Sequence, residues 1–214
     1  MTVLLLILIA AIAYGLGGIN GAIVASWVLH KKDIRNYGSH NAGLTNYYRT
    51  FGAAGVAVVI GIDIVKAVIA VLIGRALLGI VGAPVVGKLF AGFCLILGHM
   101  FPAFHRFKGG KGALSGAVLA FMVDWRVGLL MIVVFVLVII FTRYVSLGSM
   151  LAALSFPILL WSFNYGTLEG VLGLLCALLV IVKHAENILR LIGGTESKLN
   201  FKKSAHGGDE DEEE

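Results

Sequence analysis

Apolar runs of membrane-span length, separated by short polar segments, constrain the fold of this chain more than any other feature. Hydrophobic residues make up 59% of the 214 positions and charged residues 14%, whereas soluble domains are about half apolar and about a quarter charged. A run of about 20 apolar residues crosses the hydrocarbon of a bilayer as a helix. We therefore predict an all-α, polytopic integral membrane protein.

Seven apolar segments are expected to be transmembrane helices. They cover residues 2–29, 51–74, 89–104, 113–123, 127–141, 147–163 and 168–182. Residues 75–88 are expected to form a connection, because glycine and proline mark this stretch. Segment 113–123 is the shortest of the seven and falls well below the usual length of a span.

The distribution of lysine and arginine predicts the orientation of these spans. With seven spans, thirteen of the seventeen Lys and Arg residues lie on the side of the C-terminus and three on the other side, and Lys66 lies inside the membrane. Basic residues gather in cytoplasmic loops, so the N-terminus is expected outside and the C-terminus in the cytoplasm. This orientation brings three polar segments, residues 30–49, 106–112 and 183–198, to the cytoplasmic face of the membrane, where a single active site can be built from them.

The chain is expected to form one membrane-embedded domain, residues 1–203, followed by an acidic tail, residues 204–214. The last six residues are all Asp or Glu, so the formal net charge of +5 conceals a remainder of +11. Such a run of like charges is typical of a solvated, disordered segment, and we assign it no function. Cys94 and Cys176 lie in apolar runs without metal or redox spacing, so we expect buried packing and infer no disulfide.

Residues 98–112, which include the second polar segment, contain a glycine- and lysine-rich stretch: Lys108, Gly109, Gly110, Lys111 and Gly112. Glycine lets the backbone approach a ligand closely, consecutive amides form a concave anion site, and lysine is a good partner for phosphate. The pattern predicts a phosphate-binding loop at a membrane surface. On spacing alone, a basic loop that only fixes the topology is about equally compatible with it.

The first polar segment places small neutral hydrogen-bond donors between two arginines. These residues are Arg35, Ser39, Asn41, Thr45, Asn46 and Arg49. A guanidinium group matches phosphate oxygens in pairs, so an anion site is indicated. A polar interfacial loop that caps a helix would explain one or two of these residues, but less easily so many donors between two arginines.

The third polar segment contains His184, Asn187 and Arg190. If it continues the last helix, His184 and Asn187 lie on the same face. A histidine at a membrane surface is most often only interfacial, and it becomes a general-base candidate if a substrate hydroxyl can reach it. His99 ends an apolar segment and is interpreted as structural. The six histidines show no metal-binding spacing.

Asp63 and Lys66 lie three positions apart within an apolar segment, close enough to pair on one helical face. Charged groups in a membrane are costly and usually face protein or water. A structural ion pair is slightly favoured over a polar lining near the site.

Three long motifs in order give a much more specific signal than any glycine loop. The first, Asp-x-Arg-x-x-Gly-Ser-Gly-Asn-x-Gly-x-Thr-Asn-x-x-Arg, matches residues 33–49 at every fixed position but one. The second, Gly-His-x-x-Pro-x-Phe-x-x-Phe-Lys-Gly-Gly-Lys-Gly, matches residues 98–112 in full, and the third, His-x-x-Asn-Ile-x-Arg-Leu-x-x-Gly-x-Glu-x-Lys, matches residues 184–198 in full. The chain therefore resembles the bacterial acyl-phosphate:glycerol-3-phosphate acyltransferases, which are small polytopic inner-membrane enzymes.

The chain departs from this family pattern in two places. His40 stands where the family usually has glycine, and Gly18 and Asn20 stand where the family usually has serine and proline. If position 40 requires a positive φ, histidine adopts it at some cost. Both departures leave open an altered substrate preference or a weak activity.

The resemblance implies the reaction and its setting. An acyl group passes from acyl phosphate to the 1-hydroxyl of glycerol 3-phosphate, which gives lysophosphatidic acid and phosphate for phospholipid biosynthesis. The implied partners are these two substrates and membrane lipid, with no metal, bound cofactor or nucleic acid, and the oligomeric state is left open. An anion or phosphate-ester transporter is the alternative. It predicts two related halves and charges deep in several spans, but no internal repeat is visible and only Asp63 and Lys66 lie deep.

The resemblance also implies roles for individual residues. Catalytic roles fall to Ser39, Lys108, His184 and Asn187. Binding of substrate phosphate falls to Arg35, Asn41, Thr45, Asn46, Arg49, Gly109, Gly110, Lys111, Gly112 and Arg190. The amides and lysines of residues 108–112 would hold the acyl phosphate. The proton of the acceptor hydroxyl could pass to His184 or to a substrate phosphate oxygen.

Overall fold

The structure, a computed structural model, describes residues 1–199, so the expected acidic tail at residues 204–214 lies outside the described residues. Residues 1–199 are helical with short connections. The α-helices are α1 Thr2–Gly18, α2 Gly21–His30, α3 Leu44–Phe51, α4 Val56–Gly79, α5 Pro84–Met100, α6 Ala113–Val123, α7 Trp125–Thr142, α8 Val145–Ser162, α9 Thr167–Lys183 and α10 Ala185–Ile192. Two short 3-10 helices, η1 Ile34–Asn36 and η2 Ala103–His105, lie in the polar segments.

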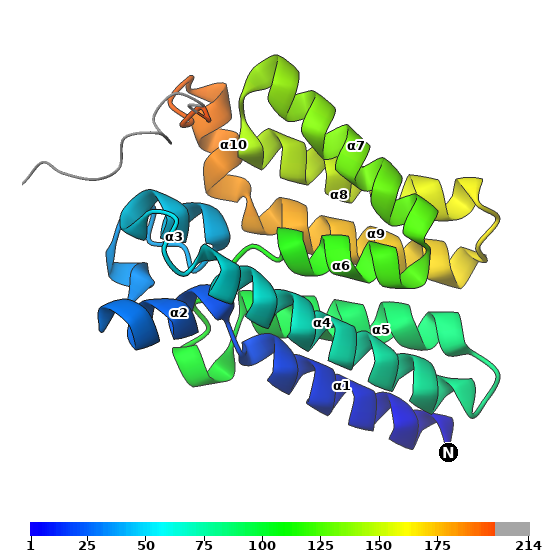
Figure 1. Ribbon diagram of the computed structural model, residues 1–214. Coiled ribbons are helices and arrows are strands. Elements are labelled where there is room, and N and C mark those ends of the chain that lie inside the picture. The colour runs from blue at the N-terminus through cyan, green and yellow to red at the C-terminus, as the bar shows by residue number, and fades with distance from the viewer. Residues whose placement is uncertain (200–214) are drawn as a thin grey trace, which may run out of the picture.

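The long helices form a bundle, and the short helices gather at one end of it (Figure 1). Helix α1 packs against α4 and α5, α5 also packs against α6 and α9, and α7, α8 and α9 pack in sequence. The N-terminus lies at the end of the bundle away from α2, α3 and α10 (Figure 1). All three polar segments therefore meet at the opposite end, as the sequence predicts for segments that build one site.

Among residues 1–199, five helical stretches are long and apolar enough to cross a membrane, and a sixth is added if α9 and α10, which meet at a 59° bend, count as one. The chain is thus an all-helical protein with several apolar spans. Helix α6 has the predicted bounds but only 11 residues. A count of seven spans stays a prediction.

The second and third spans are displaced from their predicted positions. Helix α4 begins five residues later than expected because Gly52 and Gly55 adopt positive φ, and it continues to Gly79 through Arg75. Helix α5 begins at Pro84, which is favoured in the first turn of a helix, and therefore includes Lys88. The predicted connection at residues 75–88 was wrong, since only residues 80–83 join the two helices.

The first apolar run is broken at Ile19 and Asn20 rather than forming one continuous helix. Lys66 supplies partners for the carbonyls at the end of α1, since its ammonium lies 2.7 Å from Ile19 O and 3.3 Å from Gly17 O. Asp63 accepts from the first amide of α2, Gly21 N, at 3.2 Å. The two side chains pair with each other at 2.7 Å. The expected ion pair is confirmed, and it satisfies backbone groups that a helix break leaves unpaired.

Close packing of α4 on α5 depends on glycine. A Cβ at Gly74 would lie 2.2 Å from Gly87 O, and one at Gly87 would lie 2.1 Å from Gly74 O. Small residues at a membrane helix interface let two backbones approach in this way. Cys94 and Cys176 are free and buried, which confirms the packing role expected for them.

We expect Gly74→Ala to destabilise the bundle by about 1–3 kcal/mol, because the added methyl group overlaps a backbone carbonyl and forces α4 and α5 apart. Gly61 lies in the same helix with nothing within 4 Å of an added Cβ. Gly61→Ala should therefore be neutral or stabilising by up to about 1 kcal/mol. Thermal unfolding of both variants in one detergent measures the difference, and equal midpoints would contradict the prediction.

Candidate active site

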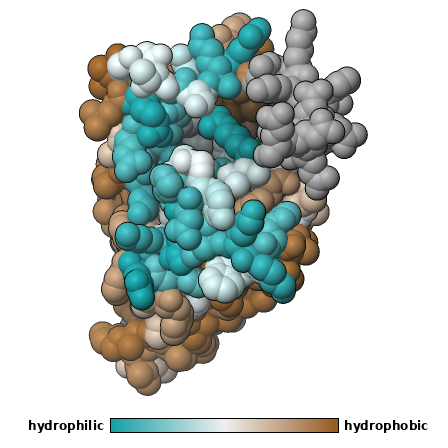
Figure 2. Space-filling model, turned by 90° about the vertical axis from the view of Figure 1, so that its left-hand side faces the viewer, coloured by the Kyte–Doolittle hydropathy of each residue, from teal (hydrophilic) through white to brown (hydrophobic). Residues whose placement is uncertain are grey.

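A cavity of about 730 Å³ opens among the three polar segments and continues into the bundle. Hydrophilic residues gather at the end of the molecule where α2, α3 and α10 meet, and the surface is hollowed among them (Figure 2). Ten of the fourteen predicted site residues line the cavity: Ser39, Asn41, Thr45, Asn46, Arg49, Lys111, Gly112, His184, Asn187 and Arg190. Arg35, Lys108, Gly109 and Gly110 do not line it.

The first polar segment is held in shape by Asn46, which is buried. Its amide oxygen accepts from Ser39 N at 2.9 Å, and its nitrogen donates to Tyr37 O and Asn41 O, each at 3.0 Å. The amide of Asn46 is thus used within the loop, so its contribution to the site is to position Ser39 and Asn41.

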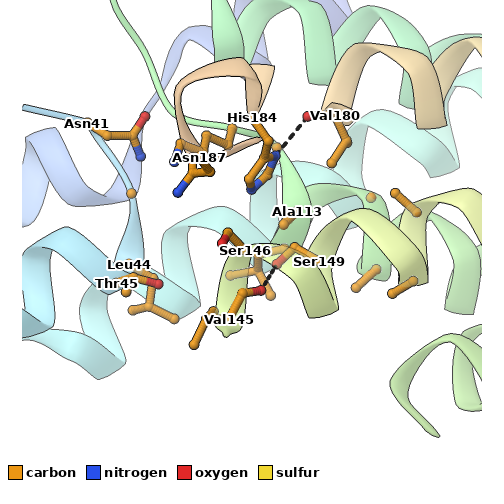
Figure 3. A pocket seen from close by; sticks show the side chains of 18 of the residues that line it. Asn41, Leu44, Thr45, Ala113, Val145, Ser146, Ser149, Val180, His184 and Asn187 are labelled. Carbon is orange, nitrogen blue, oxygen red and sulfur yellow. Dashed lines mark hydrogen bonds between the residues drawn. The ribbon is translucent and has the colours of Figure 1, made fainter. Parts of the chain in front are cut away.

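Four other side chains of this segment face the cavity with polar groups that make no hydrogen bond to the described residues: Ser39, Asn41, Thr45 and Arg49. Asn41 and Thr45 border the space from the side of α3, as Figure 3 shows. Two hydroxyls, an amide and a guanidinium can therefore donate to the oxygens of a ligand.

His40 has φ of +57°, in the left-handed region that glycine adopts more readily. Its Nδ1 lies 3.0 Å from Arg35 O, and since a carbonyl only accepts, Nδ1 donates. This hydrogen bond offsets part of the backbone cost and keeps the turn that carries Ser39 in place.

Arg35 joins two polar segments rather than lining the cavity. Its guanidinium pairs with Asp33 at 2.6 Å and donates to His105 O at 2.8 Å. Hydrogen bonding to Arg35 holds the pKa of the Asp33 carboxyl below its usual value. The glycine loop is thereby attached to the first polar segment.

The glycine loop differs from the predicted nest of free amides. The amides of Lys108, Gly109 and Gly110 donate to His105 O, Met100 O and His99 O at 3.1–3.2 Å. A Cβ at Gly109 would lie 2.1 Å from His99 O. Gly109 and Gly110 therefore let the loop pack on the end of α5, and Lys108 is exposed and does not line the cavity.

Lys111 is the lysine of this loop that reaches the cavity. Its ammonium donates to Asn187 Oδ1, and it precedes Gly112, whose φ of +76° starts helix α6. Burial lowers the pKa of Lys111 to about 8, an effect that Arg190 increases and Glu196 opposes. A partly buried cation thus stands beside a helix N-terminus, an arrangement that favours anions.

His184 lies at the bend between α9 and α10, with Nδ1 2.8 Å from Val180 O. A carbonyl cannot donate, so Nδ1 carries the hydrogen and Nε2 keeps its lone pair for the cavity. Burial lowers the pKa of His184 to about 4, with Lys111 adding to the effect and the Val180 hydrogen bond opposing it. The imidazole is therefore neutral and accepts a hydrogen bond.

Asn187 is fixed by Glu196, which the sequence analysis did not select as a site residue. Glu196 Oε1 accepts from Asn187 Nδ2 at 2.7 Å and from Ser146 Oγ at 2.5 Å, and its Oε2 accepts from Arg190 at 2.8 Å. Figure 3 shows His184 and Asn187 on one side of the cavity and Ser146 and Ser149 of α8 on the other. The fixed position of Glu196 in the third motif was the signal that could have identified it.

The deeper part of the cavity is apolar. Its lining comes from α6, α7, α8 and α9 and includes Leu114, Met131, Phe135, Phe156 and Val180. Asp63 and His99, both interpreted as structural from the sequence, also line the cavity.

Within residues 1–199, no group of three or more His, Cys, Asp or Glu side chains could hold a metal ion.

The cavity thus joins a polar mouth that suits anions to an apolar space between the helices, and this shape and polarity fit an amphiphilic ligand. The family described as "Glycerol-3-phosphate acyltransferase" matches residues 7–194. The glycerol-3-phosphate acyltransferase of Thermoanaerobacter pseudethanolicus is 42% identical over 196 residues, which cover 92% of this chain and 96% of that protein. Glycerol-3-phosphate acyltransferase 2 of Bacillus anthracis is 40% identical over 195 residues, which cover 90% of this chain and 98% of that protein.

Two solved structures resemble this fold over most of their length. A crystal structure of PlsY (YgiH), an integral membrane glycerol 3-phosphate acyltransferase, in its glycerol 3-phosphate form superposes with a TM-score of 0.82 at 31% identity and covers 92% of this chain and 97% of that one. The lysophosphatidic acid form superposes with a TM-score of 0.81 at 29% identity and covers 93% and 97%. The chain therefore belongs to the glycerol-3-phosphate acyltransferase family and is an integral membrane acyltransferase, which confirms the predicted resemblance and the prediction of an enzyme.

We expect kcat/KM for the acceptor to fall as the pH rises through about 8, because Lys111 loses the positive charge that attracts an anion. The quantity kcat/KM reports the ionisation of the free enzyme. In Lys111→Arg the charge persists at alkaline pH, so the decline should disappear. Initial rates from about pH 7 to about pH 9.5, corrected for donor hydrolysis, test this, and parallel profiles for both proteins would contradict it.

Proposed function

We propose that this acyltransferase moves an acyl chain from acyl phosphate to the 1-hydroxyl of glycerol 3-phosphate, giving lysophosphatidic acid and inorganic phosphate. The observation that carries the proposal is that His184 Nε2, Lys111 and Asn187 line one cavity whose mouth is polar and whose depth is apolar. An acyl phosphate combines these two characters in one molecule. The relatives and the two forms of PlsY support glycerol 3-phosphate as the acceptor.

The acyl chain would occupy the apolar depth between α6 and α9, which leaves the phosphate at the mouth. We assign the phosphate groups of donor and acceptor to the unpaired polar side chains described above together with Lys111 and Arg190. Lys108 is exposed outside the cavity, so its role would be to raise the local concentration of anions. Arg35, Asn46, Gly109 and Gly110 would hold the loops that carry the binding groups.

The hydroxyl oxygen would attack the acyl carbon, and the bond between that carbon and the phosphate oxygen would break. His184 Nε2 would accept a hydrogen bond from the hydroxyl and orient it. Because the pKa of His184 lies near 4, its imidazole is a weak base at neutral pH, and we assign the proton to the departing phosphate. Lys111 and Asn187 would lie beside the negative charge that develops on the reacting groups and would stabilise it.

The setting of the reaction follows from the same arrangement. Residues 1–203 would form one membrane-embedded domain, with seven spans, the N-terminus outside and the C-terminus in the cytoplasm. The excess of basic residues on the side of the polar segments would then place the active site on the cytoplasmic face of the inner membrane.

The test uses the purified full-length protein in lipid with palmitoyl phosphate and glycerol 3-phosphate, and it follows phosphate release together with lysophosphatidic acid. Wild-type protein should form both products in equal amounts. Phosphate release without lysophosphatidic acid, or no reaction by folded protein, would contradict the proposal.

Two lysine variants test the assignment of the anion site. We expect Lys111→Ala to lower kcat/KM by about 100-fold or more, since removal of one group that stabilises developing charge costs about that much. Lys108→Ala should cost less than about 10-fold, as expected when a rim charge affects only encounter. The reverse order would move the anion site to the exposed part of the loop.

A further inference from the structure

Two polar side chains in the cavity wall take no part in the reaction described above. Asp63 of α4 and His99 of α5 both line the cavity, yet they are only 4% and 5% exposed. Asp63 Oδ1 lies 3.9 Å from His99 Nδ1, so both groups border the same part of the wall. Buried polar groups that face a ligand cavity need partners when the cavity is filled.

Lys66 fixes the tautomer of His99. The ammonium of Lys66 lies 2.9 Å from His99 Nδ1, and it is held there by Asp63 and by Ile19 O. An ammonium group donates and cannot accept. Nδ1 is therefore the acceptor, and the hydrogen of the neutral imidazole is on Nε2.

His99 Nε2 makes no hydrogen bond to the described residues, and it faces the seam between the first polar segment and the glycine loop. A Cβ at Gly110 would lie 2.2 Å from Nε2 and 2.6 Å from Ala42 O. Nε2 thus packs beside the backbone of Gly110, where any side chain would cover it. It is a donor without a protein partner in the cavity wall.

Asp63 provides the opposite character. Its Oδ1 accepts from Gly21 N and pairs with Lys66, and no hydrogen bond within residues 1–199 reaches Oδ2. The carboxylate thus keeps acceptor capacity at the cavity, and its nearest approach to His99 is at Nδ1, on the other edge of the ring from the Nε2–H donor.

A hydroxyl is the ligand group that suits the Nε2–H donor in a wall that also holds a carboxylate, because it accepts as a neutral group and can itself donate. A phosphate oxygen could accept from His99 but would be repelled by the carboxylate of Asp63. An alkyl group would leave both polar groups without partners, which is costly in a buried site.

We propose that His99 binds the 2-hydroxyl of glycerol 3-phosphate, the hydroxyl that does not react, through Nε2–H, while the Asp63 carboxylate disfavours an anionic group there, and that the two residues so select a vicinal diol phosphate as the acceptor. This rests on the proposed function, which places the reacting 1-hydroxyl at His184. Asp63 and His99 are then specificity-determining residues, held in place by the ion pair that closes the break between α1 and α2.

The test compares glycerol 3-phosphate with 3-hydroxypropyl phosphate, which keeps the phosphate and the primary hydroxyl but lacks the secondary one. A site built to bind a hydroxyl strongly rejects an analogue without it. We expect wild-type kcat/KM to favour glycerol 3-phosphate by at least about 100-fold. In His99→Asn, whose shorter amide can accept from Lys66 but does not reach the Nε2 position, this preference should shrink by at least about 10-fold.

His99→Gln is the matched variant, because its longer amide can place a donor near the Nε2 position. Its preference should stay within about 3-fold of wild type even if its absolute rate falls. Tyr165→Phe, which removes a hydrogen bond to Asp124 outside the cavity, controls for a general loss of stability and should leave the preference unchanged.

The possible results separate the inference from the function on which it rests. An equal loss on both acceptors in His99→Asn would make His99 purely structural and would overturn the inference, as would a wild-type enzyme with no preference. If wild-type protein forms no product with glycerol 3-phosphate, the proposed function is overturned and the inference falls with it.

Discussion

The ion pair between Asp63 and Lys66 is the interaction on which the rest of the structure depends. Separating two charges from water is costly and is repaid only when further polar groups satisfy them. Here those groups are the carbonyls at the end of α1, the first amide of α2 and the imidazole of His99. One pair of side chains therefore connects α1, α2, α4 and α5 where the apolar bundle gives way to the polar end. The cavity lies against this connection, so the side chains that satisfy the break between α1 and α2 also form part of the wall of the candidate active site.

The remaining polar contacts connect loops to one another more than to a ligand. Asn20 caps α2 through Ile23 N and also donates to Ala42 O, and Arg35 joins the first polar segment to the glycine loop. Glu196 holds Asn187, Arg190 and Ser146 together. Each motif thus contains residues that face the cavity and residues that keep those in position, and electrostatic catalysis requires preorganisation of this kind.

Much of this architecture could be predicted from the sequence, because its causes are local. Apolar runs determine where membrane helices form, and the motifs brought ten of the fourteen chosen residues to one cavity. Helix ends were predicted less well, since Gly52, Gly55 and Pro84 shift α4 and α5 through backbone geometry that an average over apolar residues does not detect. The glycine loop shows a second limit. Glycine permits close approach to a ligand or to another part of the protein. Only the position of His99 in the structure shows that Gly109 and Gly110 let the loop pack against the end of α5.

The apolar depth of the cavity has a consequence for the hydrolysis of the proposed acyl phosphate donor. An acyl phosphate is a mixed anhydride, and water competes with the acceptor for its carbonyl carbon. With the acyl chain between α6 and α9 and the carbonyl near His184, the reactive bond would lie where the polar mouth meets the apolar depth. Apolar side chains such as Val180 and Phe156 line this depth and would exclude water from that side of the bond. An enclosed site protects a reactive group from hydrolysis in this way. The apolar residues that would enclose the acyl chain would then also determine what fraction of the donor is hydrolysed instead of being used for acyl transfer.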